Sequence, residues 1–513
     1  MKQTTYEEIQ TIAASGRYRK VPVSREMYSD IRTPIEVLRI LQENSGHCFM
    51  LESAEDRKQW GRYTFLGYDP ALEVTCTDGE LILTAREEIL ANILGEKMVN
   101  PENLPSGQMR VKMRDVPPGE MIEQILEANR SPRIDTLPTF TGGLVGYFSY
   151  DYIKYSEPSL KLDAADEEQF KDVDLMLFDK VIAYDNFRQK IILMVNMETK
   201  NLEAGYQEAV TVLDTMEKLI RSGKAEKRAE GHLRSEFRPL FSEKEYCEKV
   251  EQVKHYIHEG DLFQLVLSNR LEADFEGSLL DTYRVLRTTN PSPYMFYFCS
   301  EDVEIAGASP ETLVKVENDE IRTFPLAGTR PRGKNSEQDA ALERELLSDE
   351  KECAEHNMLV DLGRNDLGKL CRFGSVEVEK YMFVERYSHV MHIGSTVKGQ
   401  LREDAKSVDA IASVLPAGTL SGAPKIRACQ IIQELEGNKR GIYGGAIGYL
   451  DFTGNLDTCI AIRLAFKKNG KLYVRSGAGI VADSVPEKEY QECINKAKAV
   501  LQALKEAEGG MDL

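Results

Sequence analysis

The sequence lacks the marks of a membrane protein, a secreted protein or a disulfide-linked protein. No stretch approaches the roughly 18 consecutive apolar residues of a membrane span, and the opening MKQTTYEEIQ has no apolar core of a secretion signal. The nine cysteines are odd in number and include no CxxC pair, which suits reduced cytosolic thiols better than disulfides or structural zinc. We therefore expect a cytoplasmic protein.

Positive charge is also scarce. The 65 Lys and Arg residues face 84 Asp and Glu residues, so the net charge is −19, which repels a phosphate backbone and disfavours nucleic acid as a partner. Apolar residues, at 42%, are abundant enough for a large folded core. At about 100 to 200 residues per domain, the 513 residues predict two to four domains or one large sheet architecture.

The pattern along the chain predicts a mixed α/β (α+β) fold in two regions. Residues 1–220 mix strand-like runs with helical stretches, and the charged, aliphatic-poor segment 221–241 is expected to be a linker. Residues 242–505 form the second region, and 506–513 a tail. The second region contains three hairpin signals, KVENDEIRTF, LDFTGNLDTCIAIRL and AFKKNGKLYVRSG, which predict a largely antiparallel sheet.

Two pairs of glutamates share the same spacing. Glu352 and Glu355 stand three residues apart on one predicted helix, and Glu489 and Glu492 repeat this spacing on the last predicted helix, so each pair projects from one helix face. Composition by itself favours a solvated, salt-bridged face. The alternative is that the two helices face each other and hold a hard cation through carboxylate oxygens, as magnesium prefers.

Five glycine-rich segments suggest anion binding by the backbone. Glycine lets the backbone approach an anion closely, so that free N–H groups bind a carboxylate or phosphate. No segment matches GxxxxGK[ST], and no GxGxxG follows a strand, which disfavours nucleotide binding. Tight turns in an antiparallel sheet would explain any one of the segments, but five are harder to explain in this way. The segments are GASPETL, LAGTRPRG, AGTLSGAPKIR, GIYGGAIGY and SGAG.

Two polar residues stand in apolar surroundings. Arg463 lies in LDTCIAIRLAF, and a buried guanidinium needs an anionic partner, either a protein carboxylate or a carboxylate of a ligand. His392 lies in HVMHIGS, and a lone histidine in such a strand is more often a core residue than an acid. The surrounding residues do not choose between these alternatives.

Taken in order, these segments resemble the chorismate-utilising enzymes, and within them the large, aminating subunits of the anthranilate synthase family. The resemblance runs from Arg32 to Leu504 and rests on GASPETL, LAGTRPRG, AEHNMLVDLGRND, PAGTLSGAPKIRA and SGAGIVADSVPEKEYQE. It implies a multilayered α/β fold with large, mainly antiparallel sheets flanked by helices. It also implies that chorismate, a dicarboxylate, is bound together with Mg²⁺.

The resemblance assigns roles to residues that match the family motifs. It implies that Glu355 and Glu492 bind the metal, supported by Glu489 and Glu352, and that His392 protonates the departing 4-hydroxyl with Glu311 as its acidic partner. Thr419 falls in the loop that lines the same pocket. The substrate-binding positions implied by the resemblance are Tyr443, Arg463, Gly477, Ala478, Gly479, Gly328, Thr329 and Lys425.

Two positions separate the relatives that share these motifs. Relatives that add water carry a lysine base where this chain has Gln264, which disfavours water as the nucleophile. Aminodeoxychorismate synthases usually carry a nucleophilic lysine where this chain has Ala327, and a methyl group forms no covalent adduct.

The resemblance also implies a partner and an inhibitor. No cysteine lies in a GxCxGHQ-type nucleophile elbow, so glutamine hydrolysis would need a separate glutaminase subunit, in a heterotetramer with two copies of each subunit. Within the N-terminal region, MLES resembles part of the family's allosteric tryptophan pocket, as does NPSPYMF in the second region. The implied pocket residues are Leu51, Glu52, Ser53, Pro293, Tyr294, Met295 and Cys459. Cys459 precedes Arg463 by four residues on the same predicted strand, which suggests a route between the two sites.

The sequence is therefore expected to encode an aminase that converts chorismate and ammonia into anthranilate and pyruvate, the first committed step of tryptophan biosynthesis. The main alternative within the fold is aminodeoxychorismate synthase, which retains the enolpyruvyl group. From another class, the chain could be a non-catalytic sensor of chorismate or tryptophan.

Overall fold

The computed structural model describes residues 2–54, 61–95, 98–225, 229–386 and 390–511. Its described strands form two large sheets. The strands of the first sheet are β1 (Lys20–Tyr28), β2 (Cys48–Glu52), β3 (Tyr63–Tyr68), β10 (Lys180–Asp185), β11 (Lys190–Glu198), β12 (His232–Leu233), β13 (Arg238–Pro239), β14 (Gln264–Glu276), β15 (Tyr294–Cys299), β16 (Val303–Ser309), β22 (Gly422–Ala423), β25 (Leu464–Lys468) and β26 (Lys471–Ile480). They follow the order β1-β11-β10-β3-β2-β15-β16-β25-β26-β14-β12, with β13 and β22 also paired to β14.

The strands of the second sheet are also paired antiparallel. Its strands are β4 (Leu72–Thr77), β5 (Glu80–Ala85), β6 (Glu102–Asn103), β7 (Met109–Met113), β8 (Gly143–Phe148), β9 (Val173–Phe178), β17 (Thr312–Glu317), β18 (Glu320–Thr323), β19 (Leu326–Pro331), β20 (Glu377–Arg386), β21 (Val390–Gln400), β23 (Ala446–Asp451) and β24 (Leu456–Ile460). The order is β19-β21-β18-β17-β24-β23-β8-β9-β4-β5-β7-β6, with β20 paired to β21. All pairings between the named strands of both sheets are antiparallel, as the sequence predicted.

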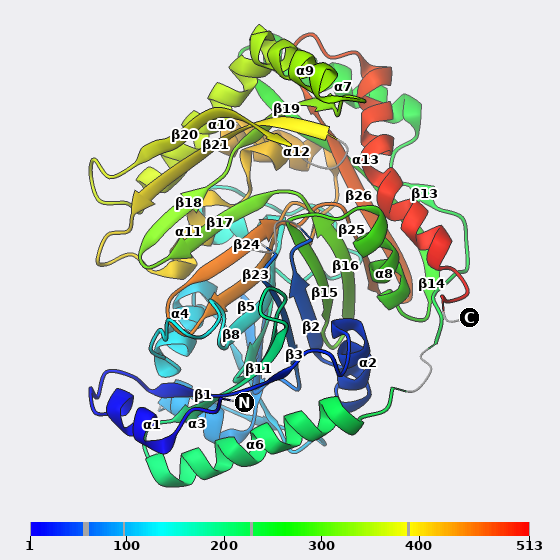
Figure 1. Cartoon of the computed structure of the whole chain (residues 1–513). Coiled ribbons are helices and arrows are strands. Elements are labelled where there is room, and N and C mark those ends of the chain that lie inside the picture. The colour runs from blue at the N-terminus through cyan, green and yellow to red at the C-terminus, as the bar shows by residue number, and fades with distance from the viewer. Residues whose placement is uncertain (1, 55–60, 96–97, 226–228, 387–389, 512–513) are drawn as a thin grey trace.

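Helices cover the outer faces of both sheets (Figure 1). The described helices are α1 (Tyr6–Ala13), α2 (Pro34–Asn44), α3 (Glu87–Leu94), α4 (Pro118–Ala128), α5 (Ile153–Ser156), α6 (Leu202–Ser222), α7 (Glu243–His258), α8 (Leu280–Thr289), α9 (Ser336–Ser348), α10 (Glu350–Gly368), α11 (Ser407–Val414), α12 (Lys425–Glu436) and α13 (Pro486–Ala507), with 3₁₀ turns η2 (Tyr150–Tyr152) and η3 (Gly418–Leu420).

Three apolar clusters define four layers. One cluster is rich in phenylalanine and joins the inner faces of the two sheets, with Phe49 and Phe296 from the first sheet and Phe178 and Ile447 from the second. A second cluster packs α2, α6, α8 and α13 on the outer face of the first sheet. A third packs α3, α4, α10 and α11 on the second sheet. The result is a helix–sheet–sheet–helix arrangement, which confirms the multilayered fold that the resemblance implied.

The three expected hairpins are present. They are β17–β18, β23–β24 and β25–β26. At the β25–β26 turn, Asn469 and Gly470 have φ angles of 53° and 73°, the left-handed conformation that this two-residue turn needs. Arg463 differs from expectation, because β24 ends at Ile460 and β25 begins at Leu464. It therefore lies in the link between two strands, with a φ of 54°, and does not share a strand with Cys459.

Both sheets contain strands from before and from after the segment 221–241, and the two groups of strands meet at one pair in each sheet. In the first sheet β2 pairs with β15, and in the second β8 pairs with β23. The two predicted regions therefore share both sheets, and the boundary at 221–241 stays a prediction from the sequence. Residues 226–228 of this segment lie outside the described residues. The tail 506–513 also stays a prediction from the sequence, and its last two residues are outside the described range.

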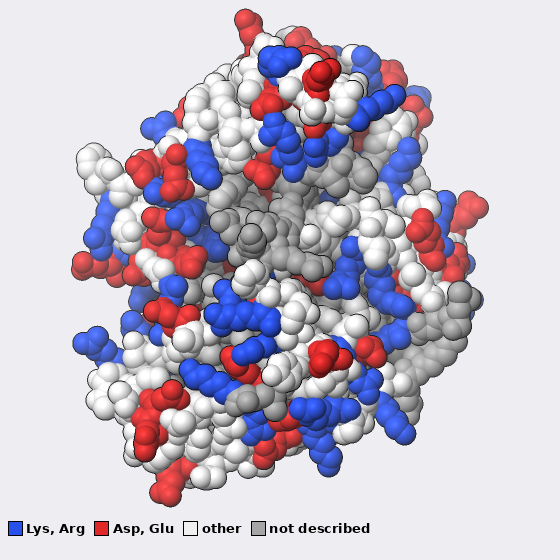
Figure 2. Space-filling view, in the orientation of Figure 1, with Lys and Arg blue, Asp and Glu red and all other residues white. Residues whose placement is uncertain are grey.

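The surface and the thiols agree with the composition. Figure 2 shows Lys and Arg side chains interspersed with Asp and Glu on the face displayed. All nine cysteines are free thiols. None of the helices in the described ranges has the length and apolar character that crossing a bilayer requires.

Candidate active site

The two acidic pairs lie on α10 and α13, as the sequence predicted. Asp349 caps α10 by accepting hydrogen bonds from the backbone N–H groups of Lys351 and Glu352, which places Glu352 and Glu355 in the first turns of the helix. Burial and the neighbouring Glu352 raise the pKa of Glu355, and burial also raises the pKa of Glu489. Each pair therefore holds negative charge in a partly desolvated place.

The charges of the two helices interact with each other. The ammonium of Lys496 on α13 lowers the pKa of Glu355 on α10, and the ammonium of Lys351 on α10 lowers the pKa of Glu489 on α13, although burial outweighs both effects. The helices thus place their acidic pairs within electrostatic reach, as the metal-site alternative requires.

His392 is held by the strand next to it. Its Nδ1 lies 2.9 Å from the carbonyl oxygen of Gly328 and 3.1 Å from the hydroxyl of Thr329, both on β19. Because a carbonyl only accepts, Nδ1 carries the proton and donates it to Gly328. Burial, together with the charge of Arg463, lowers the pKa of His392. The free protein therefore favours neutral imidazole over the imidazolium expected from the sequence.

Gly328 fits its place because it has no side chain. Its φ of +66° is left-handed, and a Cβ there would lie 3.1 Å from Oε2 of Glu352. A bulge lies at this residue, between Ala327 and Thr329 in the pairing with β21.

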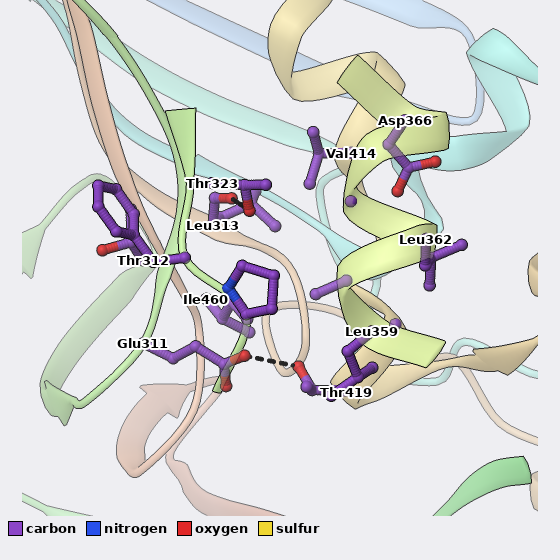
Figure 3. A pocket seen from close by; sticks show the side chains of 15 residues that line it. Glu311, Thr312, Leu313, Thr323, Leu359, Leu362, Asp366, Val414, Thr419 and Ile460 are labelled. Carbon is purple, nitrogen blue, oxygen red and sulfur yellow. Dashed lines mark hydrogen bonds between the residues drawn. The ribbon is translucent and has the colours of Figure 1, made fainter. Parts of the chain in front are cut away.

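Glu311 lies at the end of a small cavity of about 40 Å³ (Figure 3). Its Oε1 accepts a hydrogen bond of 2.9 Å from the hydroxyl of Thr419. Desolvation raises the pKa of Glu311 to about 7, although the Thr419 hydroxyl and the Lys496 ammonium both act to lower it. Near neutral pH this carboxyl can therefore give up a proton. The pairing of Glu311 with His392 stays a prediction.

The expected carboxylate cradle is built around Arg463. No carboxylate among the described residues lies within ion-pair distance of its guanidinium, so of the two partners considered for Arg463 the ligand is favoured. Gly477 packs closely against Tyr443, since a Cβ at Gly477 would lie 3.1 Å from the phenolic oxygen. Because β25 pairs with β26 only as far as Val474, no described strand covers the second edge of Gly477, Ala478 and Gly479. The carbonyl oxygen of Gly477 accepts a hydrogen bond of 3.0 Å from Lys496, and the binding of a ligand by the backbone of these three residues stays a prediction.

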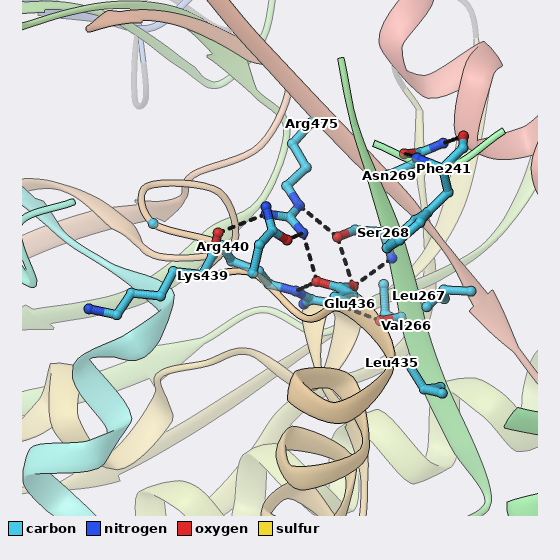
Figure 4. Close-up of polar contacts among 12 residues, drawn as sticks. Phe241, Val266, Leu267, Ser268, Asn269, Leu435, Glu436, Lys439, Arg440 and Arg475 are labelled. Atoms are coloured by element: carbon cyan, nitrogen blue, oxygen red, sulfur yellow. Dashed lines mark hydrogen bonds and ion pairs between the residues drawn. The ribbon is translucent and has the colours of Figure 1, made fainter. Parts of the chain in front are cut away.

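A buried ion network includes Arg475 of β26, the strand that carries Gly477 to Gly479 (Figure 4). Glu436 accepts hydrogen bonds from Arg440 (2.9 Å), Arg475 (2.9 Å) and the hydroxyl of Ser268 (2.8 Å). Although burial by itself raises the pKa of Glu436, the two guanidinium groups outweigh it and lower that pKa. Ser268 lies opposite Gly477 in the β14–β26 register, so the network fixes the position of the cradle strand.

Lys425 is held by groups of the protein. Its ammonium is buried and donates to Asp366 and to the carbonyl oxygen of Val414, both at 2.8 Å. It joins the start of α12 to α10, and the expectation that it binds the substrate stays a prediction.

Sequence reasoning missed Lys496 and the contacts of Gln264. Lys496 lies four residues after Glu492 on α13, and its Nζ is 2.7 Å from that carboxylate and 3.0 Å from the carbonyl oxygen of Gly477. This i, i+4 spacing was the available signal. Gln264 donates from Nε2 to Glu355 at 3.2 Å, and its buried Oε1 has no hydrogen-bond partner in the described part of the chain.

The family model for chorismate binding enzymes matches residues 47–502. The chain belongs to this chorismate-binding enzyme family. It is 44% identical to anthranilate synthase component 1 of Acetivibrio thermocellus and 42% identical to that of Aquifex aeolicus, each alignment covering 98% of both chains. The crystal structure of anthranilate synthase component I from Streptococcus pneumoniae is similar with a TM-score of 0.70 and 37% identity, covering 86% of this chain and 92% of that one.

A second solved structure, with much lower sequence identity, shares the fold. The menaquinone-specific isochorismate synthase of Escherichia coli matches with a TM-score of 0.65 over 97% of this chain and 99% of that one. At 18% identity, this likeness shows the architecture alone.

This chorismate-binding enzyme has a second pocket, of about 410 Å³, between the sheets. All seven residues expected to bind tryptophan line it: Leu51, Glu52, Ser53, Pro293, Tyr294, Met295 and Cys459. Glu52 is held by the hydroxyl of Tyr283 (2.7 Å) and by Arg287 (2.9 Å). Asp457 and Tyr449 also line the pocket, although the sequence did not single them out.

The two pockets share a wall. The hydroxyl of Tyr294 lies 2.8 Å from Asp457 and 3.0 Å from the hydroxyl of Thr312, which directly follows Glu311 in the chain. Contact between the pockets therefore runs through Thr312, and the route expected from Cys459 to Arg463 along one strand is corrected.

Proposed function

We propose that this chain is the aminase subunit of an anthranilate synthase, which converts chorismate and ammonia into anthranilate and pyruvate through an aminated intermediate. One observation carries the proposal: Arg463, a cation with no described carboxylate partner, lies close enough to Glu492 and His392 to interact electrostatically with both. This arrangement suits a substrate whose carboxylates bind between the acidic pairs and the cradle. The relatives named anthranilate synthase component 1 support the choice of reaction.

Each side of the substrate has its own residues. Arg463, with Tyr443 and the backbone of Gly477 to Gly479, binds the enolpyruvyl carboxylate, because a guanidinium donates two parallel hydrogen bonds. Glu355 and Glu492, aided by Glu352 and Glu489, hold Mg²⁺, which when bound supplies positive charge for the ring carboxylate.

The proton and the nucleophile are handled by separate groups. Glu311 donates a proton to the leaving 4-hydroxyl, since its pKa of about 7 suits that task better than the lowered pKa of His392. His392, with Nδ1–H bound to Gly328, then positions the hydroxyl. Gln264 orients ammonia by accepting one of its N–H groups on Oε1. Position 264 carries glutamine instead of a lysine that would activate water, and position 327 carries alanine instead of a lysine that would form a covalent adduct.

The direct test uses the purified chain with chorismate, Mg²⁺ and an ammonium salt. Anthranilate fluorescence and pyruvate should appear together, and more rapidly at high pH, where more ammonia is unprotonated. An aminated product that keeps its enolpyruvyl group would instead identify aminodeoxychorismate synthase. Unchanged chorismate would identify a sensor.

The nitrogen comes from glutamine, which a partner protein hydrolyses to ammonia. The name component 1 of the relatives implies a component 2, and no cysteine of this chain has the setting of a glutaminase nucleophile. We therefore expect glutamine to be inert with the single chain and to become a substrate when a glutaminase subunit joins it in a heterotetramer. Glutamine-dependent anthranilate formation by the pure chain would exclude this arrangement. The nine free thiols fit a cytoplasmic location.

Tryptophan inhibits the enzyme from the second pocket. Asp457 binds its amino group, Tyr294 and Met295 contact the indole, and the Tyr294–Thr312 contact passes the change to Glu311. The expected coupling is ~1 to 3 kcal/mol, and chorismate must weaken tryptophan binding by the same factor.

Ser53→Phe should relieve this inhibition, because the ring occupies space that indole needs. The concentration of tryptophan for half-inhibition should rise at least ~10-fold, a loss of about 1.4 kcal/mol, while the rate without tryptophan changes little. Tyr294→Phe should keep tryptophan binding, measured by calorimetry, but weaken inhibition. Unchanged sensitivity in Ser53→Phe, or a parent chain insensitive to millimolar tryptophan, would show that the regulatory site lies elsewhere.

A further inference from the structure

The acidic site contains a protein cation, Lys496. Lys496 Nζ lies 2.7 Å from Glu492 and donates to the carbonyl oxygen of Gly477 at 3.0 Å. The same ammonium interacts electrostatically with Glu311, Glu355 and Glu489, which come from three different parts of the chain. The single positive charge of Lys496 therefore interacts with four carboxylates.

The other helix has a cation of its own. Arg330 of β19 donates to Glu352 at 3.2 Å, and it is anchored by Asp349 at 2.8 Å and Glu345 at 3.0 Å. Each acidic pair thus contains one glutamate bound to a basic side chain. In keeping with this, no three metal-ligating side chains of the described ranges are gathered closely enough to hold an ion.

The donor set suits magnesium, but its arrangement here does not. Four carboxylates offer the hard oxygen ligands that Mg²⁺ prefers, and two of them are bound by Lys496 and Arg330 instead. We propose that Lys496 and Arg330 are counter-cations that keep the acidic pairs in place without metal, and that chorismate admits the metal by giving Lys496 a new carboxylate partner. This inference rests on the proposed function, because it assumes that chorismate and Mg²⁺ share the site.

Electrostatics gives the direction of the effect. Before substrate binds, an incoming divalent cation meets the positive charge of Lys496 and must displace it from Glu492. A chorismate carboxylate attracts the ammonium, so Glu492 is released and the added negative charge favours the metal. By linkage, chorismate and metal then raise each other's affinity by the same factor. Lys496 is the better residue to test, because its side chain is 37% exposed and Arg330 also anchors the start of α10.

The experiment measures metal binding rather than turnover. Mn²⁺, a hard cation seen directly by electron paramagnetic resonance, is titrated into the full chain with and without chorismate, and with no ammonia present. The parent should bind Mn²⁺ at least ~10-fold more tightly when chorismate is present. Lys496→Gln should bind Mn²⁺ about 10-fold more tightly than the parent without chorismate, and chorismate should add little. Lys496→Arg, which keeps the charge, should behave as the parent does.

A matched control lies two residues away on the same helix. Lys498 is exposed and donates only to Asn495 among the described residues, so Lys498→Gln removes the same charge from α13 without touching the site. It should leave both affinities unchanged. Glu355→Gln and Glu492→Gln distinguish binding of Mn²⁺ at this site, which they should weaken, from general binding of Mn²⁺ to an acidic protein, which they should not.

The outcomes separate the inference from the proposed function. Equal Mn²⁺ affinity of the parent and Lys496→Gln without chorismate would overturn the counter-cation role while leaving the metal site intact. Equal effects of Lys496→Gln and Lys498→Gln would do the same. Absence of site-specific Mn²⁺ binding in the parent even with chorismate would overturn the magnesium site itself, and the inference with it.

Discussion

Glu355→Gln and Glu492→Gln should each lower the rate of anthranilate formation by ~10²-fold or more. Each change keeps the size of the side chain and removes one negative charge from the site. Glu355 is oriented by Gln264 and Glu492 by Lys496, so both carboxylates are held in place before any ligand binds. Loss of such preorganised charge should weaken the binding of Mg²⁺ and with it the positive charge that the ring carboxylate needs.

The controls for this result lie on the same two helices. Glu350→Gln on α10 and Glu487→Gln on α13 remove exposed first-turn charges. They should cost little activity. The rates are measured by anthranilate fluorescence at saturating chorismate and a range of Mg²⁺ concentrations. Full activity of Glu355→Gln and Glu492→Gln in the presence of a chelator would exclude a catalytic metal on these residues.

Glu311→Gln should lower the rate by about 10² to 10⁴-fold, the range expected when a general acid is lost. In the free enzyme, Glu311 keeps its proton at pH values below its pKa of about 7, so kcat/KM of the parent should fall as pH rises through 7. Glu311→Gln should remove this fall from the pH profile. Because the supply of free ammonia changes with pH, the profile must be recorded at a constant concentration of free ammonia.

Thr419→Val provides a test of opposite sign. The Thr419 hydroxyl donates to Glu311 and lowers the pKa of that carboxyl, so its removal should move the fall in kcat/KM to higher pH.

The stability of the parent follows the same titration of Glu311. The pKa of Glu311 is raised on folding, so its contribution to the free energy of unfolding is present below about 4.5 and is lost as pH rises through about 7. If kcat/KM of the parent does not fall as pH rises through 7, the proton comes from another group.

Local sequence patterns predicted the elements that carry the site. Spacings of three and four residues place Glu352 with Glu355, and Glu489 with Glu492, on single helix faces, and each pair is where it was expected. The hairpins were equally predictable, because turns such as Asn469-Gly470 depend on backbone conformations within two residues. The family motifs then located the seven pocket residues, which all line one cavity.

Long-range packing decided how these elements meet. The partner of Lys425 is Asp366, the partner of Glu311 is Thr419, and the backbone of Arg463 turns between strands, none of which follows from neighbouring residues. The site carries buried charges that must be compensated, and the compensating groups come from distant parts of the chain. By itself, the sequence determined the chemistry available on each helix and strand. Only the tertiary structure decided which carboxylates are opposed by Lys496 and Arg330, because charge compensation in a desolvated site acts through space and leaves no periodic signal along the chain.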